Sequence, residues 1–404
     1  MRVAYLVSRF PHVTETFIVR ELEAVDEDPE LDIELLSLFP TVDPTVHPIA
    51  RRWTDRLRRP STRESAAAVA WWLLRRPLRF AVAVATVAIQ SARRPGILGR
   101  SLVTLPIAAA HARRLHAEPV DHIHAHYATY PALAAWFCHR LTGVSYSFTV
   151  HAHDIFVHQE MLARKIADAS FVVAISEFNR RFLVPYGGDS TTPVEVVHCG
   201  IDPDAFEFRP RIAPASGPVR AACVASLQEY KGHEVLLRAL AQGGDLERIQ
   251  LDLVGDGVLR PALEQLARDL DIADRVRFHG SLTEPQVREV LSAADVFVLP
   301  SIVARDGQME GLPVALMEAL ASGLFAVSTR LSGIPELVRD GETGALAEPG
   351  DVTSLAGALG RALHDGNDEL ALAGRRLVER EFDIDASGHR MADLLKRPVQ
   401  HPSS

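Results

Sequence analysis

The segment Glu310-Gly-Leu-Pro-Val-Ala-Leu-Met-Glu318 follows an almost wholly apolar run, Val296–Leu299. Together they predict a buried β-strand that leads through a turn into a helix ending near Gly323. Gly311 permits close approach of the backbone, and Pro313 suits the first helical turn. The free N–H groups and the positive dipole end of such a helix can hold a phosphate. This unit therefore predicts an α/β fold with an anionic ligand.

The same alternation of apolar runs and helical patterns extends along most of the chain. The predicted strands are Val3–Val7, Ile33–Leu38, His122–His126, Ser145–Val150, Phe171–Ile175, Val194–His198, Arg220–Val224, Gln250–Val254, Val276–His279, Val296–Leu299 and Phe325–Ser328. Several are apolar throughout, which is typical of parallel strands covered on both faces. The alternation predicts α/β architecture.

A length of 404 residues suggests two domains rather than one core. The segment 202–218 is rich in proline and glycine, which indicates a linker between them. The chain therefore predicts two doubly wound domains. Ligands bind such sheets at the carboxyl ends of the strands, so two facing domains would form a cleft there.

The charge is unevenly distributed. The net charge is −9, which argues against a general nucleic-acid-binding protein. The segment Arg51–Arg114, however, holds 14 arginines against Asp55 and Glu64, a local charge of +12. A basic block in an acidic protein predicts a local anionic partner.

Two apolar runs in this segment, Ala66–Leu74 and Phe80–Gln90, are separated by arginines and are too short to span a bilayer. Trp71 and Trp72 beside these arginines favour a helix lying on anionic lipid. The alternative is a helical hairpin packed on its own domain with a solvated arginine face.

The cysteines and the N-terminal segment indicate the cellular compartment. Cys138, Cys199 and Cys223 are far apart and form no paired motif, which argues against a disulfide scaffold and a cysteine zinc site. They fit a reducing cytoplasm. The opening apolar run is too short for a signal-peptide core and predicts a first strand.

Several motifs together resemble the retaining glycosyltransferases of family 4. The stretch Asp306–Ala321 is similar to the E-x7-E motif of that family, and three further segments match it: His198–Phe206, Gly333–Glu336 and Asp340–Gly344. The opening segment Ser8–Ile18 resembles a narrower group, the exopolysaccharide, capsule and colanic-acid glycosyltransferases.

The resemblance implies a GT-B fold, with two Rossmann-like domains facing across a cleft. Residues 1–205 would form the acceptor-side domain, with an Arg-rich helical insertion at about 45–115. Residues 206–381 would bind the nucleotide sugar, and a helix within 382–404 would pack back on the first domain. The resemblance implies no metal and no other cofactor.

Carried over residue by residue, the motifs assign roles in donor binding. Glu310 would contact the donor sugar and Glu318 the ribose, with Gly311, Leu312 and Pro313 forming the turn between. Lys231, one of only three lysines in the chain, matches the residue that neutralises the diphosphate. Developing negative charge on the leaving phosphates makes a lysine suitable there.

On the acceptor side, Thr149–Asp154 resembles a family segment whose histidine lies beside the donor sugar and β-phosphate. The spacing to Asp154 favours His151 over His153 for that role. Glu15 and His126 are further candidates on this side.

Other positions are expected to border the nucleotide. They are Gly255, Arg277 and Phe278. The turn Gly255-Asp-Gly257 is not a dinucleotide-binding fingerprint, since Arg260 stands where that motif needs glycine. The family often has an arginine where this chain has Ser226, and Arg9 is a candidate replacement.

His122, His124 and His126 alternate along one predicted strand, and the last two would point to the same side. Zinc commonly takes histidine ligands. No nearby third ligand is apparent, so we expect polar residues that line the cleft, without a metal.

The resemblance therefore implies a retaining, metal-independent hexosyltransferase of exopolysaccharide or capsule biosynthesis. Its donor would be a nucleotide sugar, with UDP favoured over GDP, and its acceptor a lipid-linked or growing saccharide. The basic segment 51–114 would hold it at the inner face of the plasma membrane, and no nucleic acid is expected as a partner. The alternatives are a GT-B nucleotide-sugar epimerase and a non-catalytic, membrane-bound saccharide-binding protein.

Overall fold

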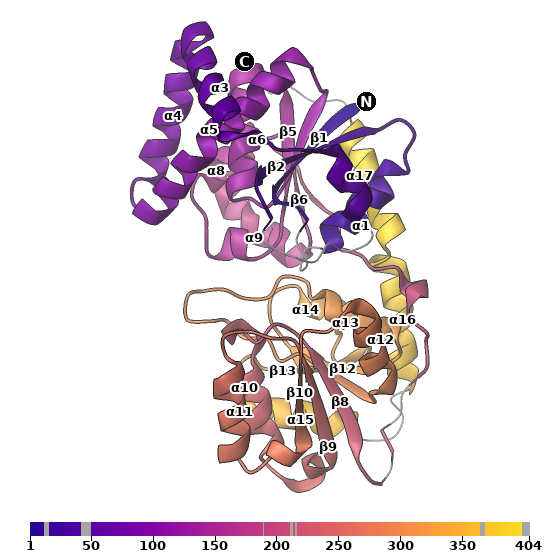
Figure 1. Ribbon diagram of the computed structural model, residues 1–404. Helices are drawn as coiled ribbons and strands as arrows, with labels where there is room; N and C mark the ends of the chain where they lie inside the picture. The colour runs from indigo at the N-terminus through magenta and orange to yellow at the C-terminus, as the bar shows by residue number, and fades with distance from the viewer. Residues whose placement is uncertain are drawn as a thin grey trace. The chain divides into compact units, whose positions relative to one another are not determined.

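The computed structural model describes residues 1–11, 16–41, 50–188, 190–210, 213–214, 216–363 and 368–397. These residues form two compact units. The first runs from Met1 to His198 and resumes at Ile384, and the second is Cys199–Asp383. In each unit a parallel sheet lies between layers of helices (Figure 1).

The sheet of the first unit has seven strands among the described residues, in the order β3-β2-β1-β4-β5-β6-β7. Their bounds are β1 Arg2–Arg9, β2 Asp32–Phe39, β3 Leu57–Arg58, β4 His122–His126, β5 Ser145–Val150, β6 Phe171–Ala174 and β7 Val194–Val196. The strand order reverses between β1 and β4. A ligand in a sheet of this kind binds beyond the carboxyl ends of the strands at such a reversal.

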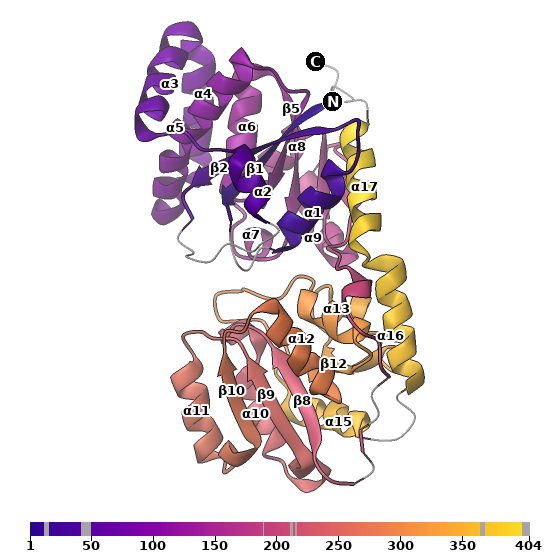
Figure 2. The ribbon, with the colours of Figure 1, turned by 45° about the vertical axis from the view of Figure 1, so that its right-hand side comes forward.

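Ten helices of the described residues surround this sheet. They are α1 Thr16–Asp26, α2 Arg51–Arg56, α3 Thr62–Arg75, α4 Pro77–Ser91, α5 Pro95–Ala117, α6 Tyr130–Thr142, α7 His153–Phe156, α8 Leu162–Asp168, α9 Glu177–Gly187 and α17 Ile384–Lys396. Helix α17 comes from the end of the chain and lies beside α1 in both views (Figures 1 and 2). A side chain on Gly388 would put its Cβ 2.2 Å from the Cβ of Ala24, so only glycine permits this close packing.

The second unit has six strands among the described residues, in the order β10-β9-β8-β11-β12-β13. Their bounds are β8 Val219–Val224, β9 Ile249–Val254, β10 Val276–Gly280, β11 Val296–Val298, β12 Phe325–Thr329 and β13 Gly344–Ala347. Its helices are α10 His233–Leu240, α11 Arg260–Asp269, α12 Glu284–Ala293, α13 Val314–Ala321, α14 Ile334–Leu337, α15 Val352–Ala362 and α16 Asp368–Glu381. Here the strand order reverses between β8 and β11.

All eleven predicted strands are confirmed to within two residues at each end, and the two that the sequence did not predict are weak in sequence. Strand β3 has only two residues, and β13 consists of Gly344-Ala-Leu-Ala347, which lacks β-branched residues. Both stand at the edge of a sheet.

The proline-rich segment 202–218 was predicted to be a linker, but its first part is packed into the second unit. The N–H of Ile201 donates to the carbonyl of Phe382 (3.0 Å). The Arg375 guanidinium donates to the carbonyls of Pro203 (2.7 Å) and Phe206 (3.2 Å). These bonds attach the start of the segment to helix α16 and to Phe382, which directly follows that helix. This part of the segment is therefore not a free connection between the units.

The arginine-rich segment forms helices α2 to α5. A capping box starts α3, where the Ser61 and Glu64 side chains accept each other's backbone N–H. No helix among the described residues combines the length and apolarity that crossing a bilayer requires. Trp72 is fully buried and its Nε1 donates to the carbonyl of Ala109 (3.0 Å). The prediction that Trp72 faces a membrane is therefore wrong, because this ring packs inside the helical layer.

Buried histidines make the fold sensitive to acid. Burial is the main cause that lowers the pKa of His111 to about 4, of His122 to about 3 and of His233 to about 4. These rings stay neutral in the folded state but take up a proton in the unfolded state below its pKa of about 6.5. Above about pH 6.5, each buried histidine therefore leaves the free energy of unfolding unchanged. Below that pH, each one lowers the free energy of unfolding by about 1.4 kcal/mol per pH unit, until the pH reaches the pKa of that histidine in the folded state.

We expect the variant His111→Gln to lose part of this acid sensitivity. Glutamine can still donate to the carbonyl of Ser37, which the His111 Nε2 contacts at 3.1 Å, but it does not titrate. Urea unfolding at pH 7 and at pH 5.5 measures how much stability each protein loses between the two conditions. The variant should lose about 1 kcal/mol less than the parent protein. An equal loss in the two proteins would contradict the assignment of His111 as a buried neutral group.

Candidate active site

Three loops at the carboxyl edge of the second sheet meet through their backbones. A Cβ on Gly232 (φ +74°) would lie 1.9 Å from the carbonyl oxygen of Pro300, and a Cβ on Gly255 (φ +132°) would lie 2.0 Å from that of Ala225. The loops after β8, β9 and β11 can approach this closely only because both positions are glycine. Gly255, expected to border the nucleotide, thus has a clear structural role.

Lys231 and Glu310 form an ion pair at this edge. The Lys231 Nζ donates to the Glu310 Oε2, and the two side chains are only 13% and 12% exposed. Burial alone would lower the pKa of Lys231, but the charge and hydrogen bond of the adjacent Glu310 carboxylate, with a further electrostatic contribution from Tyr230, outweigh it, so the pKa is raised. The structure therefore brings together two predicted catalytic residues 79 positions apart and keeps the lysine charged.

The turn after Glu310 is held by a residue that sequence reasoning missed. The Ser332 Oγ lies 2.5 Å from the carbonyl oxygen of Glu310 and 2.9 Å from that of Gly311. Ser332 itself adopts a left-handed conformation (φ +50°). Its position directly before the Gly333–Glu336 motif was the available signal.

Gly311, Leu312 and Pro313 are buried, and Pro313 is the N-cap of α13 rather than part of its first turn. Glu318 is half-buried within α13. Gly311, Leu312 and Pro313 therefore form the buried segment that leads into α13, and Glu318 lies more than one turn beyond the start of this helix.

The two predicted residues on β10 differ in their surroundings. Phe278 is half-buried with the Arg260 guanidinium 6.0 Å from its ring centroid. Arg277 is exposed and lies near the amino end of the strand, away from the edge where the loops meet. Its role at the nucleotide remains a prediction.

In the first unit, His151 directly follows β5. Its backbone N–H donates to the Asp154 carboxylate (3.1 and 3.3 Å), which also accepts from the N–H of Ala128 (2.8 Å). Asp154 is 1% exposed, and burial raises its pKa although these backbone N–H groups oppose the shift. Asp154 therefore joins the loops after β4 and β5, while His153 is exposed, with its ring 4.7 Å from that of His158.

His126, at the end of β4, contacts both His151 and Glu21. Its Nδ1 lies 3.4 Å from the His151 Nε2, and its Nε2 lies 3.1 Å from the Glu21 Oε1. Glu21, on α1, is a second residue that sequence reasoning missed. The sequence offered no local signal for it, because α1 and β4 are brought together only by the fold.

The other two strand histidines belong to a hydrogen-bonded ladder between β4 and β5. The Ser145 hydroxyl donates to the carbonyl of Asp121 (3.2 Å) and therefore accepts from the His122 Nδ1 (2.8 Å). The remaining bonds run in the same direction. Ser147 donates to the His122 Nε2 (2.7 Å) and accepts from the His124 Nδ1 (2.8 Å). Thr149 donates to the His124 Nε2 (3.0 Å). Every ring nitrogen of His122 and His124 is thereby used structurally.

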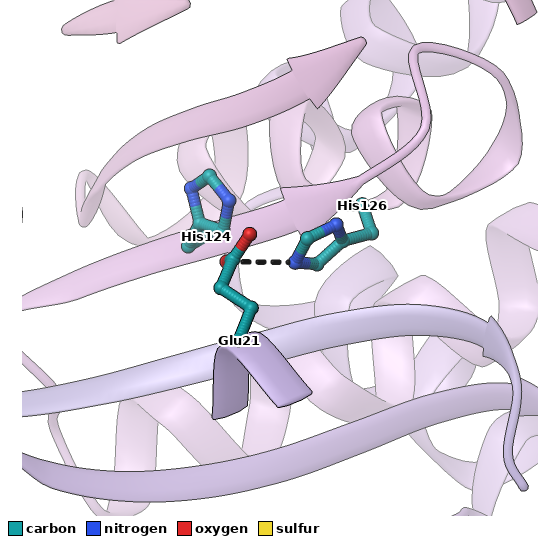
Figure 3. A group of neighbouring side chains, drawn as sticks. All are labelled: Glu21, His124 and His126. Carbon is teal, nitrogen blue, oxygen red and sulfur yellow. Dashed lines mark hydrogen bonds and ion pairs between the residues drawn. The ribbon is translucent and has the colours of Figure 1, made fainter. Parts of the chain in front are cut away.

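Glu21, His124 and His126 each offer one ligand atom, and these atoms lie within 4.8 Å of one another (Figure 3). This is the spacing of a candidate metal site, which the sequence did not reveal because Glu21 is distant in the chain. Both ring nitrogens of His124 already hydrogen-bond, one to Ser147 and one to Thr149, so a metal ion would have to displace one of these hydroxyls. The residues present therefore fit a hydrogen-bonded cluster better than a ready ligand set.

Arg9, a predicted phosphate contact, lines a pocket of roughly 480 Å³ at the carboxyl end of β1. Arg100 of α5 lines it too, with apolar contributions from Phe39, Val103 and Tyr130. Among the described residues neither guanidinium has an acidic partner within ion-pair distance. Glu15, the remaining candidate, lies outside the described residues.

Comparison with known proteins places these features in a family. The family model described as "Glycosyl transferases group 1" matches residues 204–375, and the one described as "Glycosyltransferase Family 4" matches residues 46–205. An amylovoran biosynthesis glycosyltransferase, AmsK of Erwinia amylovora, is 36% identical over 61% of this chain and 60% of its own length. A GDP-mannose-dependent alpha-(1-6)-phosphatidylinositol monomannoside mannosyltransferase of Mycolicibacterium smegmatis is 30% identical over 61% of this chain and 69% of its own length.

The fold has a close structural counterpart. HepE of Anabaena, solved in complex with UDP and glucose, aligns over 98% of this chain and 99% of its own with a TM-score of 0.69 at 17% identity. At that identity the likeness shows the shared fold, the two-sheet GT-B architecture. The chain spans 60% of the length of AmsK, so less than two thirds of that relative is matched.

Proposed function

The chain belongs to the group 1 glycosyl transferases of glycosyltransferase family 4, and from that membership we propose that it is a retaining glycosyltransferase. It would move a hexose from a nucleotide sugar to a lipid-linked or growing saccharide in exopolysaccharide or capsule biosynthesis. The observation that carries this proposal is the Lys231–Glu310 pair, 13% and 12% exposed, at the carboxyl edge of the second sheet.

In the proposed reaction, Lys231 neutralises the charge that builds up on the departing nucleotide diphosphate. Fixed charges aimed at such developing charge lower the barrier most where water is excluded. Glu310, held by Ser332, would orient the donor sugar, and Glu318 would bind the ribose. A phosphate that reaches Lys231 competes with Glu310 for the ammonium group, which would free the carboxylate for the sugar.

The relatives support a nucleotide sugar but differ in the nucleotide. HepE was solved with UDP and glucose, whereas the mycobacterial relative uses GDP-mannose. We favour a UDP-sugar for this chain. The relative AmsK, named for amylovoran biosynthesis, supports a polysaccharide pathway.

A donor screen tests the function. A ligand that binds only the folded state raises stability by about 2.7 kcal/mol at 100 times its Kd, so a thermal-shift screen of UDP- and GDP-sugars should identify the donor. With that donor, product should form only when a lipid-diphosphate saccharide is added, with retained anomeric configuration by NMR. A new nucleotide sugar formed from donor alone would indicate an epimerase, and no stabilisation by any nucleotide would indicate a saccharide-binding protein.

We also propose that the arginine-rich helices contact the inner face of the membrane, where a lipid-linked acceptor resides. Large apolar side chains stand exposed where α3 leads into α4, with Leu74 85% and Leu78 80% exposed, and Arg75 and Arg79 are exposed beside them. Apolar and basic groups on one surface are typical of helices that lie on anionic lipid. The Arg9–Arg100 pocket would suit the acceptor phosphates.

The variant Arg75→Ser/Arg79→Ser should bind anionic vesicles about 30-fold more weakly, since each basic residue near the surface contributes about 1 kcal/mol. Arg76 is left in place because its Nη1 donates to the carbonyl of Leu141 (2.9 Å) and holds the helix junction. Sedimentation with phosphatidylserine-containing vesicles measures the change.

The matched control removes the same charge elsewhere. Arg181→Ser/Arg376→Ser changes two exposed arginines outside these helices and should leave vesicle binding within about twofold. Equal binding by the two double variants would refute a specific membrane surface.

A further inference from the structure

We propose that Glu21 is a positioning residue: through His126 it fixes the tautomer of His151, so that His151 presents an unprotonated Nδ1 to substrate. The importance of His151 in transfer rests on the proposed function. The hydrogen-bond chain itself is independent of it.

The chain runs through three elements of the first unit. The carboxylate of Glu21 on α1 reaches His126 at the end of β4 (Figure 3), with 3.1 Å between Oε1 and Nε2. The His126 Nδ1 then lies 3.4 Å from the Nε2 of His151, which follows β5. A fourth group, the Tyr5 hydroxyl of β1, lies 3.3 Å from the same Glu21 Oε1.

The direction of these bonds follows from the one group that can only accept. A carboxylate has no proton to give, so the His126 Nε2–H donates to Glu21 and the Tyr5 hydroxyl donates as well. A neutral histidine that carries its proton on Nε2 has a bare Nδ1. That Nδ1 accepts from the His151 Nε2–H, and the His151 Nδ1 is left bare in turn.

The surroundings keep the His151 ring neutral and hold both rings in place. His126 is fully buried and His151 is 6% exposed. Burial, with His126 nearby, lowers the pKa of His151 well below its ordinary value. The His151 ring packs 4.9 Å from that of Phe17 and 4.6 Å from that of Tyr127 between centroids, while Asn179 donates to its carbonyl.

This assignment determines what His151 can bind. Among the described residues none hydrogen-bonds to its Nδ1, and a bare Nδ1 accepts a hydrogen bond but cannot donate one. Its ligand is therefore a group that carries a proton, such as a sugar hydroxyl, and not an ionised phosphate oxygen. Glu21 acts on this contact only through His126.

The tautomers can be read directly by NMR of protein labelled with 15N-histidine. His126 and His151 should both show the Nε2–H pattern, assigned with His126→Gln and His151→Gln variants. Because both bonds to Glu21 end on Oε1, Glu21→Gln can keep them through its amide oxygen and should preserve both patterns. Glu21→Leu removes the acceptor and should disturb both. An Nδ1–H pattern for His151 in the parent protein, or no change in Glu21→Leu, would overturn the proposal.

Kinetics separate positioning from a structural or metal role. Glu21→Leu should lower kcat by about 10- to 100-fold with little change in KM, and Glu21→Gln should stay within about threefold of the parent. In a His151→Ala background Glu21→Leu should have no further effect. Equal losses for Gln and Leu variants, together with activity that depends on added Zn²⁺, would overturn the proposal in favour of a metal site. If no transfer activity exists at all, the NMR result still decides the tautomer.

Discussion

Lys231→Met is expected to lower kcat/KM for sugar transfer by about 10³-fold. Loss of a single preorganised group that stabilises transition-state charge costs about 10²–10³ in rate, and Lys231 carries a full charge toward the proposed leaving group. Methionine keeps much of the aliphatic stem that lies 13% exposed at the end of the β8 loop. Release of nucleoside diphosphate at saturating acceptor measures the effect.

The same variant should also be less stable, because it leaves Glu310 buried without its counter-charge. Breaking a fully buried ion pair from one side costs about 3–5 kcal/mol, and this pair, 13% and 12% exposed, should fall at or below the lower end of that range. Assays must therefore be run well below the melting temperature of the variant, with circular dichroism to check that it is folded. A folded Lys231→Met protein with activity near the parent's would refute the role of Lys231.

Glu310→Gln is expected to have the second largest effect, a loss of about 10²-fold or more in kcat. The amide has the shape of the carboxylate but lacks its charge and cannot accept as strongly from a sugar hydroxyl. Its backbone should remain in place, since Ser332 contacts the carbonyl of residue 310 and not its side chain. The measurement is initial rate against donor concentration, so that kcat and KM are obtained separately.

The double variant Lys231→Met/Glu310→Gln separates stability from catalysis. With both charges removed, no uncompensated buried ion remains, so the free energy of unfolding should return to within about 1–2 kcal/mol of the parent. Transfer should stay as low as in Lys231→Met. Recovery of activity along with stability would mean that the single variants had failed only by unfolding.

The sequence predicted the parts of the site that lie within one motif and missed those that the fold assembles. The strands were predictable because parallel strands covered on both faces are apolar along their length. The turn at Glu310 was predictable from its local motif. Glu21 was not, because it acts through a contact 105 residues away that no local pattern records. Ser332 acts through a contact 22 residues away, and its place directly before the Gly333–Glu336 motif was the only local signal for it.

Two sequence expectations failed for a common reason. Trp72 was expected at a membrane surface and the segment after residue 202 was expected to be a linker. Composition favours these interpretations, but it does not specify which distant residues a segment packs against. In the structure Trp72 packs under α5, and Arg375 binds the backbone of the supposed linker.

The position of α17 bears on how the protein emerges from the ribosome. The apolar cluster around β1 and α1 includes Met391, Leu394 and Leu395, which are synthesised after the entire second unit. The first unit therefore cannot bury that face until residues 391–395 have been synthesised. Domains generally fold as they leave the ribosome, the first one first. In this protein the described strands and helices of the second unit are all synthesised before α17, which belongs to the first unit. The first unit would therefore finish folding after the second.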